Sequence, residues 1–443
     1  MFINSTKFTR LFPRNFDHID NPGPRPKIIF MTPSHPQDKP RPDFDGENFF
    51  FEMGPIRPPS EGSDHSLLIR TTRNCSWNRC AFCATYQGEK FGYRQVSDIK
   101  RDIDVARAVR EELQAAAAAG GRAGWITQDV IQGVWDGNPH LYGADSGHQT
   151  LKWQNLHNVA RWLAAGARTV FLQDADALIM RTPELLEILN YLKSALPTVE
   201  RVTAYASSRS CRRKSLEELR ELRQAGLVRL HMGLESGCDA VLERMQKGVT
   251  AREQVEAGQK VVAAGISLCD YLMPGLGGKD LSERHARDSA AVLTEINPEF
   301  IRLRSLALRR HSPLLAQARE GLFTELSEDE VVAEIALLIA NLHCGSYLVS
   351  DQMANLLYAV EGQLPQDKEK ILQVIEAYLQ KPEAERLAFR LRQRWRSFLA
   401  VYGSLPEPLE QQVQEAWDAL RREASAARAR VDAAIAALKE GFV

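Results

Sequence analysis

Residues 66–83 read SLLIRTTRNCSWNRCAFC, and this stretch decides how the rest of the chain is interpreted. Its apolar start predicts a buried strand, and the polar part that follows predicts a loop at the end of that strand. Cys75, Cys80 and Cys83, three of the seven cysteines of the chain, lie in this loop. A lone Cys inside a cell is usually a small buried side chain, but three thiols in one short loop indicate a metal site.

Composition limits the classes of protein to be considered. The chain has 443 residues, of which 44% are hydrophobic, enough for two or three domains. Its 56 Lys and Arg balance 57 Asp and Glu, so no net charge draws it to nucleic acid or to an anionic membrane. No apolar run approaches the roughly 18 residues of a membrane span, and the N-terminus has no apolar signal-peptide core. We therefore expect a cytoplasmic, reducing location and no membrane span.

Short β-branched runs alternate with helical patterns after residue 66. We predict six strands, at Ser66–Arg73, Arg168–Gln173, Glu200–Ala206, Leu227–Leu234, Ile266–Met273 and Phe300–Leu306. Capping boxes at Ser215 with Glu218 and at Thr250 with Glu253 mark helix starts, and Thr182 is expected to cap another helix. This alternation predicts an α/β fold, a parallel sheet closed in part into a TIM-like (βα)6 barrel. Such barrels carry their chemistry at the C-terminal ends of the strands.

The chain divides into three regions. Residues 1–66 hold 11 of the 21 prolines, which predicts an irregular N-terminal extension that wraps the body or is partly disordered. Residues 67–318 form the predicted barrel core, and residues 319–443 read as a helical C-terminal region. The interval from 120 to 152 inside the barrel is long and holds two of the seven Trp residues. It is either a functional insertion over the barrel mouth or a structural loop before the next helix.

The cysteine motif has the spacing C-x4-C-x2-C and follows the first predicted strand. A three-cysteine loop after the first strand of a six-fold βα repeat resembles the radical S-adenosylmethionine (SAM) superfamily, whose usual spacing is C-x3-C-x2-C. The resemblance covers residues from about 55 to 318. It implies that Cys75, Cys80 and Cys83 bind a [4Fe–4S] cluster and leave its fourth iron for S-adenosylmethionine. The strings MGPIRPP, GLVRLHMGLESG and MPGLGG are similar to a branch of this superfamily without an assigned substrate.

The resemblance also implies a set of cofactor contacts at the ends of the strands. In the family, an aromatic ring before the last Cys lines the adenine of the cofactor. Acids after the second strand accept hydrogen bonds from its ammonium group. A hydroxyl and a guanidinium after the third strand suit its carboxylate. An acid after the fourth strand suits the ribose or the ammonium, and glycines after the fifth strand let adenine approach. On these grounds the expected contacts are Phe82, Gln173, Asp174, Asp176, Ser207, Arg209, Glu235, Gly275 and Gly277. The acids are also compatible with turns or helix caps, and Phe82 with a core position.

The function implied is the reductive cleavage of S-adenosylmethionine to a 5′-deoxyadenosyl radical, which abstracts hydrogen from an unidentified small molecule or peptide. We expect an anaerobic oxidoreductase or transferase and an external electron donor such as flavodoxin or ferredoxin. One alternative is transfer of an aminocarboxypropyl or methyl(thio) group by the same cluster, and another is a zinc-stabilised binding module. The other four cysteines, Cys211, Cys238, Cys269 and Cys344, are dispersed, so no second cluster is expected. No basic, aromatic-rich terminal domain suggests nucleic acid.

Overall fold

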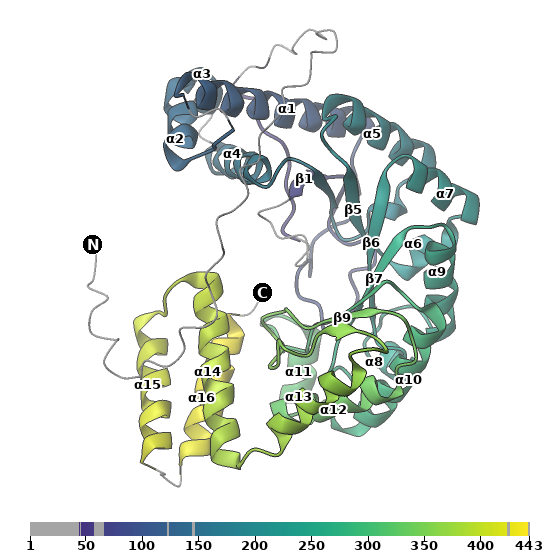
Figure 1. Ribbon diagram of the computed structural model, residues 1–443, viewed down its shortest axis with the longest axis vertical. Coiled ribbons are helices and arrows are strands. Elements are labelled where there is room, and N and C mark those ends of the chain that lie inside the picture. The colour runs from purple at the N-terminus through teal and green to yellow at the C-terminus, as the bar shows by residue number, and fades with distance from the viewer. Residues whose placement is uncertain are drawn as a thin grey trace.

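The chain folds around one large parallel sheet (Figure 1). This computed structural model describes residues 44, 46–56, 66–121, 124–143, 147–422 and 426–441. The main sheet has the strand order β1-β4-β5-β6-β7-β8-β9-β10, and β2 pairs with β3 in a second, two-stranded sheet. The strands are β1 (Ser66–Arg70), β2 (Thr72–Arg73), β3 (Gly92–Tyr93), β4 (Thr169–Gln173), β5 (Arg201–Ala206), β6 (Leu227–Glu235), β7 (Ser267–Leu272), β8 (Phe300–Leu303), β9 (Tyr347–Val349) and β10 (Gly362–Gln363).

All six predicted strands are present, and they pair in parallel in the order in which they occur in the chain. The α/β barrel-like architecture predicted from the alternation is therefore confirmed. The first predicted strand is interrupted at Thr71, so that β1 continues the main sheet while β2 turns away to pair with β3. This break lets the chain leave the sheet just before the cysteine loop begins.

Helices lie along the outer side of the arc of strands, where Figure 1 shows α1, α5, α7, α9 and α10. The helices are α1 (Val96–Ala119), α2 (Gln128–Gly137), α3 (Pro139–Tyr142), α4 (Gln149–Ala164), η2 (Ala177–Ile179), α5 (Thr182–Ala195), α6 (Ser208–Arg213), α7 (Leu216–Gln224), α8 (Asp239–Arg244), α9 (Ala251–Ala263), α10 (Gly278–Ile296), α11 (Pro313–Arg319), α12 (Glu328–Asn341), α13 (Lys368–Leu379), α14 (Glu383–Tyr402), α15 (Glu407–Arg421) and α16 (Ala427–Glu440). Both capping boxes predicted within the barrel are formed. Thr182 does not cap α5, because the helix already includes it and Arg181 is the N-cap residue.

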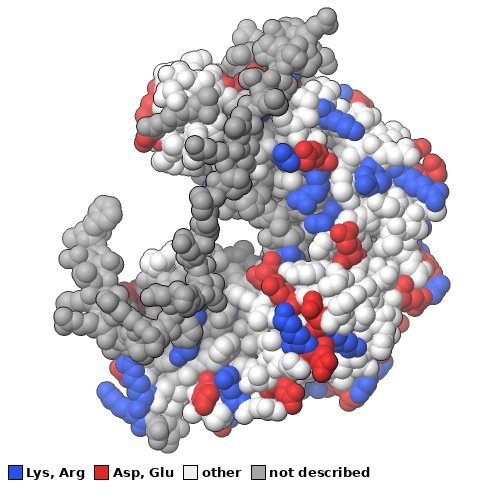
Figure 2. Space-filling model, viewed as in Figure 1, with Lys and Arg blue, Asp and Glu red and all other residues white. Residues whose placement is uncertain are grey.

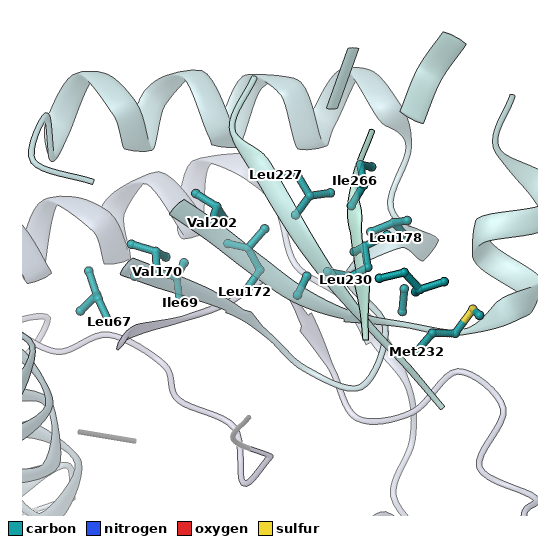
Figure 3. Packing of buried hydrophobic residues seen from close by; sticks show 14 of the residues in the cluster. Leu67, Ile69, Val170, Leu172, Leu178, Val202, Leu227, Leu230, Met232 and Ile266 are labelled. Carbon is teal, nitrogen blue, oxygen red and sulfur yellow. The ribbon is translucent and has the colours of Figure 1, made fainter. Parts of the chain in front are cut away.

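The main core fills the space between the sheet and these helices (Figure 3). Leu67 and Ile69 on β1 are two residues apart, so they point to the same face, and both are fully buried. Val170 and Leu172 repeat this pattern on β4. Burying each such side chain stabilises the fold by ~1.5–3 kcal/mol. The opposite, inward face of the sheet is left for the polar and aromatic residues described below.

The C-terminal region is mainly helical, as predicted, and it also contributes two short strands. Tyr347–Val349 forms β9, which pairs in parallel with β8 and thereby adds a seventh parallel strand to the sheet. Gly362–Gln363 forms β10, which pairs antiparallel with β9. An exposed edge strand leaves a row of backbone groups unpaired, and β9 satisfies the edge of β8. Ser327 and Glu330 form a capping box at the start of α12.

Part of the Pro-rich extension packs on the barrel. Residues 46–56 contain no helix or strand, yet Phe49 and Phe51 are buried. The backbone N–H of Phe51 donates to Asn155 Oδ1 at 2.9 Å, and Asn155 Nδ2 donates back to the carbonyl of Phe51 at 3.0 Å. The predicted irregular path is thus present in this segment. Residues 1–43, 45 and 57–65 of the extension lie outside the described residues.

The long interval before α4 has a structural role in its described part. Its helix α2 packs against α1, and its aromatic side chains gather into a cluster. The ring of Trp135 is 5.1 Å from that of Tyr142 and 4.9 Å from that of Trp153. Phe49 of the extension packs edge-on against Tyr142 at 5.4 Å. Of the two alternatives for this interval, the contacts favour a structural loop.

Surface charge is mixed on the face shown in Figure 2, where Lys and Arg lie among Asp and Glu. This agrees with the balanced composition of 56 basic and 57 acidic residues. Within the part of the chain that the structure describes, no helix is both long and apolar enough to cross a membrane.

Candidate functional site

The cysteine loop lies across the C-terminal ends of the parallel strands. It connects β2 to β3, and its backbone is held by segments that follow β6 and β8. The N–H of Ala81 donates to the carbonyl of Met245 at 2.9 Å, and the N–H of Leu314 donates to the carbonyl of Ala81 at 2.8 Å. Trp77 Nε1 donates to the carbonyl of Gln246 at 2.7 Å. The loop is therefore fixed at the end of the barrel where such folds place their chemistry.

The interval between Cys75 and Cys80 has its own turn. Asn78 has a left-handed backbone with φ of 47°, which Asn tolerates better than most residues. Its Nδ2 donates to the carbonyls of Tyr86 and Glu89, and its N–H donates to Cys75 Sγ at 3.4 Å. The four-residue spacing of this motif is thus accommodated by a local turn inside the loop.

Trp77, within that turn, packs on a glycine. A Cβ atom on Gly248 would lie 2.2 Å from the Trp77 ring, so only a glycine allows the ring to approach this closely. The guanidinium of Arg209 also lies over Trp77, 3.7 Å from the centroid of its ring. This stack brings a side chain from α6, one of the predicted cofactor contacts, beside the cysteine loop.

The three thiols of the loop are half-buried and free of disulfide bonds. Burial raises the pKa of the Cys80 thiol to about 11; nearby Lys247 opposes the rise, and the neighbouring thiols of Cys83 and Cys75 add to it. Among the described residues, no three His, Cys, Asp or Glu side chains converge as ligands of a single metal ion.

Lys247 faces the cysteine loop and was not predicted from the sequence. Its Nζ lies 3.4 Å from Glu235 Oε1 and 5.8 Å from the centroid of the Phe82 ring. Burial lowers the pKa of Lys247, but Glu235, Cys80 and Cys75 raise it, and the net shift is upward. Lys247 follows α8 in a connection without motif or periodicity, so only the fold reveals its position. Glu235 and Phe82, both predicted contacts, are thus brought together around one cation.

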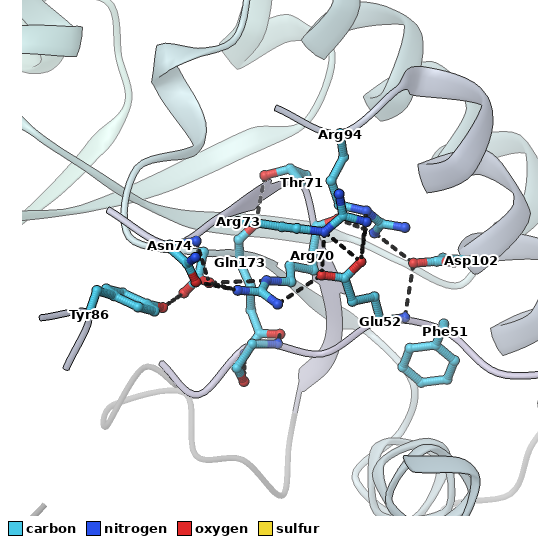
Figure 4. Close-up of polar contacts among 12 residues, drawn as sticks. Phe51, Glu52, Arg70, Thr71, Arg73, Asn74, Tyr86, Arg94, Asp102 and Gln173 are labelled. Atoms are coloured by element: carbon cyan, nitrogen blue, oxygen red, sulfur yellow. Dashed lines mark hydrogen bonds and ion pairs between the residues drawn. The ribbon is translucent and has the colours of Figure 1, made fainter. Parts of the chain in front are cut away.

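Gln173 and Asp174 have partners within the chain, next to the ion pair of Arg70 with Glu52 that Figure 4 shows. Gln173 Oε1 accepts from the N–H of Gly54 at 2.9 Å, and Gln173 Nε2 donates to the carbonyls of Gly54 and Ile56 at 3.1 and 2.6 Å. Asp174 is buried; it accepts from Arg70 at 2.6 Å and from the Tyr86 hydroxyl. Burial raises the pKa of Asp174, and the hydrogen bonds from Tyr86 and Arg70 oppose that rise. These side chains hold the extension and the cysteine loop together, and their expected contact with an ammonium remains a prediction.

Asp176 supports the start of α6. Its Oδ2 accepts from the hydroxyls of Ser207 and Ser210, both at 2.6 Å, and burial raises its pKa while these hydroxyls oppose the rise. Ser207 caps α6, because its Oγ accepts from the N–H of Ser210 at 3.1 Å. Asp176 therefore acts on the site through Ser207 and α6, the helix that carries Arg209.

Gly275 is favoured by its left-handed backbone, with φ of 89°, and Gly277 is required by close packing. The N–H of Gly275 donates to Glu334 Oε1 of α12 at 2.7 Å. A Cβ atom on Gly277 would lie 2.9 Å from the carbonyl of Leu281 and 3.0 Å from the Cβ of His285. The glycines thus join β7 closely to α10 and α12, and their expected contact with adenine remains a prediction.

Aromatic side chains form a row on the inward face of the sheet. The centroids of Phe171 and Tyr205 are 5.2 Å apart, those of Tyr205 and His231 5.7 Å, and those of His231 and Tyr271 5.9 Å. Arg302 follows on β8, opposite Tyr271 in the strand pairing, and pairs with Asp351. The interior of the barrel therefore presents rings with polar atoms rather than aliphatic side chains.

Comparisons with known proteins give one family match and several distant structural likenesses. A sequence model described as the radical SAM superfamily matches residues 137–288, which begin after the cysteine loop. No curated protein matches the chain. Among solved structures, Elp3 of the archaeon Methanocaldococcus infernus is 13% identical with a TM-score of 0.36, and the match covers 54% of this chain and 60% of that one.

Two further structures are similarly distant. Methylornithine synthase is 14% identical with a TM-score of 0.37, over 74% of this chain and 86% of that one. Coproporphyrinogen III oxidase of Escherichia coli is 14% identical with a TM-score of 0.36, and the match covers 62% of this chain and 51% of that one. The chain thus covers less than two thirds of Elp3 and of the oxidase, and these likenesses add nothing to the residue assignments. The family match therefore shows a likeness to the radical SAM superfamily over residues 137–288.

Proposed function

We propose that Cys75, Cys80 and Cys83 hold a [4Fe–4S] cluster with one iron left open, and that the enzyme generates a 5′-deoxyadenosyl radical for hydrogen abstraction. The observation that carries this proposal is the position of the loop, which hydrogen bonds from Ala81 and Trp77 hold across the C-terminal end of the barrel. When bound, the cluster supplies the electron that breaks a carbon–sulfur bond of S-adenosylmethionine. The inner face of the barrel is then next to the reactive carbon.

The donor set fits such a cluster. Three thiols without a fourth ligand leave one coordination position for a small molecule, which a closed structural zinc site does not. Thiolates and cluster together carry negative charge, and two cations lie beside them. Lys247 is close enough to Cys80 and Cys75 for their charges to raise its pKa, and Cys80 and Cys75 act in the same sense on Arg209.

The residues around the loop suit the polar groups of S-adenosylmethionine. We assign Phe82 to the adenine, and Ser207 with Arg209 to the carboxylate, by charge-assisted hydrogen bonds. Glu235, whose carboxylate faces Lys247 at 3.4 Å, is assigned to the ribose or the ammonium. Gly275 and Gly277 stay assigned to the edge of the adenine.

Gln173, Asp174 and Asp176 are assigned a supporting role, because each has partners within the chain. They hold the cysteine loop and α6 in place rather than contact the cofactor. The electron comes from an external protein such as a flavodoxin or a ferredoxin, and the substrate is a small molecule or a peptide.

The decisive experiment is anaerobic. Reconstituted enzyme, reduced with dithionite, is incubated with S-adenosylmethionine, and the nucleosides are identified by mass spectrometry against a Cys80→Ala control. We expect 5′-deoxyadenosine from the wild type only. Methylthioadenosine as the main enzyme-dependent product would instead support aminocarboxypropyl transfer. Stoichiometric zinc without sulfide in the isolated protein would favour a binding module.

A further inference from the structure

A buried histidine of α10 joins two of the segments assigned to the cofactor. His285 is 1% exposed, and its Nδ1 lies 2.8 Å from the hydroxyl of Ser236, the residue after Glu235. Its Nε2 lies 3.0 Å from the carbonyl oxygen of Met273, the residue after β7. Burial lowers the pKa of His285 and so favours a neutral ring. Because a carbonyl only accepts, Nε2 carries the proton, and Nδ1 accepts from the Ser236 hydroxyl.

The segment after β6 is anchored at each of its next positions. Glu235 has a left-handed backbone, with φ of 65°, which is unfavourable for a residue with a long side chain. The carbonyl of Ser236 accepts from Gln254 Nε2 at 2.8 Å. The N–H of Gly237 donates to Ser289 Oγ at 2.8 Å, and a Cβ atom on Gly237 would lie 2.6 Å from the Cα of Ser289. These contacts hold the residues that follow Glu235 and thereby keep its unfavourable conformation in place.

The turn after β7 is held from a second side by α12, a helix of the C-terminal region. The N–H of Gly275 donates to Glu334 Oε1 at 2.7 Å, and the hydroxyl of Ser282 donates to Glu334 Oε2. Glu334 is 5% exposed, so both oxygens of a buried carboxylate have partners. A Cβ atom on Gly278 would lie 2.8 Å from the ring of Phe323, so the connection before α12 also packs closely on this turn. A residue outside the predicted barrel thus helps to hold the turn assigned to adenine.

His285 and Glu334 act on one connected unit of backbone. The N–H of Met273 donates to the carbonyl of Glu235 at 3.0 Å, so the segments after β6 and β7 are also joined directly. Nε2 of His285 lies 3.7 Å from Glu334 Oε1, which places the two buried side chains next to each other. A displacement of either side chain would therefore shift both Glu235 and Gly275, the residues assigned to the ribose or ammonium and to the adenine.

We propose that His285 and Glu334 are positioning residues for the binding of S-adenosylmethionine. His285 keeps the segment after β6 in the conformation that directs Glu235 to the cofactor. Glu334 keeps Gly275 at the edge of the adenine. This inference rests on the proposed function, because it assumes that these two segments contact the cofactor. A buried polar network whose members have partners holds one arrangement rigidly, which lowers the cost of ordering the site when the cofactor binds.

Calorimetric titration of the full-length, reconstituted enzyme with S-adenosylmethionine, without a reductant, tests the network. His285→Phe keeps a ring but removes both hydrogen bonds, and Glu334→Leu removes the acceptor of the Gly275 N–H. Each should weaken binding about tenfold and leave the cluster absorption unchanged. Glu334→Gln should bind within about threefold of the wild type, because its amide oxygen still accepts from Gly275. Asn158→Leu is the matched control, since it removes two buried hydrogen bonds to the backbone of β1 near the N-terminal end of that strand, and it should bind like the wild type.

Kinetics give a second readout. In His285→Phe and Glu334→Leu the KM for S-adenosylmethionine should rise about tenfold while kcat for 5′-deoxyadenosine stays near that of the wild type, because neither side chain contacts the reacting atoms. Wild-type affinity in both variants would overturn the inference, and so would an equal loss of affinity in Asn158→Leu. Misfolding of both variants would overturn it as well, since the network would then serve the fold as a whole. A wild type that binds S-adenosylmethionine but forms no 5′-deoxyadenosine would overturn the proposed function alone, and the affinities of the variants would still decide this inference.

Discussion

At the scale of single residues, the seven cysteines fall into two groups. Cys75, Cys80 and Cys83 are half-buried on one loop, whereas Cys211, Cys238, Cys269 and Cys344 are buried on separate elements. Replacing any of the first three by Ala should abolish stable cluster binding, because the cluster would keep only two thiolates. Each of the other four Ala variants should retain about four irons per chain. Iron and sulfide analysis after anaerobic reconstitution measures both groups.

Cys238 is the sharpest control in that series, because it packs in the same apolar cluster as Ala81 of the cysteine loop. Its replacement by Ala removes only one buried sulfur atom, at a cost of about 1 kcal/mol in the free energy of unfolding. Loss of the cluster in this variant would contradict the assignment of the three ligands more directly than loss in any other.

Asp174 offers a test of whether it supports the fold or binds the cofactor. It is fully buried against Arg70, whose side chain is 12% exposed. Asp174→Asn should lower the free energy of unfolding by ~3 kcal/mol or more, because it leaves a buried cation short of a partner. Asp280→Asn breaks an exposed Arg–Asp pair with Arg244 and should cost less than ~1 kcal/mol. Urea denaturation compares the stability of the two variants. If Asp174→Asn were as stable as the wild type but bound S-adenosylmethionine more weakly, Asp174 would be a contact of the cofactor's ammonium group.

At the scale of elements, the packing of Trp77 on Gly248 positions the cysteine loop. Gly248→Ala combines a left-handed backbone, φ of 71°, with a clash against the Trp77 ring. Gly265→Ala is the matched control, because φ there is 75° and no atom lies within 4 Å of the added methyl group. Both variants should lose ~1 kcal/mol to backbone strain. Only Gly248→Ala should also lose cluster content in iron analysis, and equal cluster content in the two would show that Trp77 does not position the loop.

The strands of the barrel were predictable because each combines a short apolar run with a helix start after it. β9 and β10 carry no such signal, since they have three and two residues and exist because β8 offers an unpaired edge. Their cause lies in the tertiary fold rather than in local sequence.

The candidate site also combines residues with a local sequence signal and residues that only the tertiary fold brings together. Three thiols adjacent in the sequence identify the cysteine loop, whereas the partners of Gln173 and Asp174 lie more than 100 residues away, at Gly54 and Arg70. Lys247 was missed for the same reason, because only the folded chain brings it to Cys80. Residues that act through distant partners could not be assigned from the sequence alone.

At the scale of the whole molecule, the hydrophobic clusters divide the C-terminal region in two. The main core includes Leu348 of β9 and Ile371 of α13. A separate cluster joins α14, α15 and α16 through residues such as Leu391, Phe398 and Ile435. The predicted boundary at residue 318 therefore falls inside the packing unit of the barrel, and we infer that this unit continues through α13.

Two similar truncations of aliphatic side chains test that division. Leu348 is fully buried and Ile435 is 6% exposed, so Ala at either position should lower stability by ~2–4 kcal/mol. Leu348→Ala should increase hydrogen exchange at the backbone amides of β7 and β8, because β9 completes their sheet. Ile435→Ala should increase exchange only within α14, α15 and α16, since its contacts belong to the separate cluster. If β8 exchanged no faster in Leu348→Ala than in the wild type, residues 319–443 would form an independent domain, and the barrel would be complete with six strands.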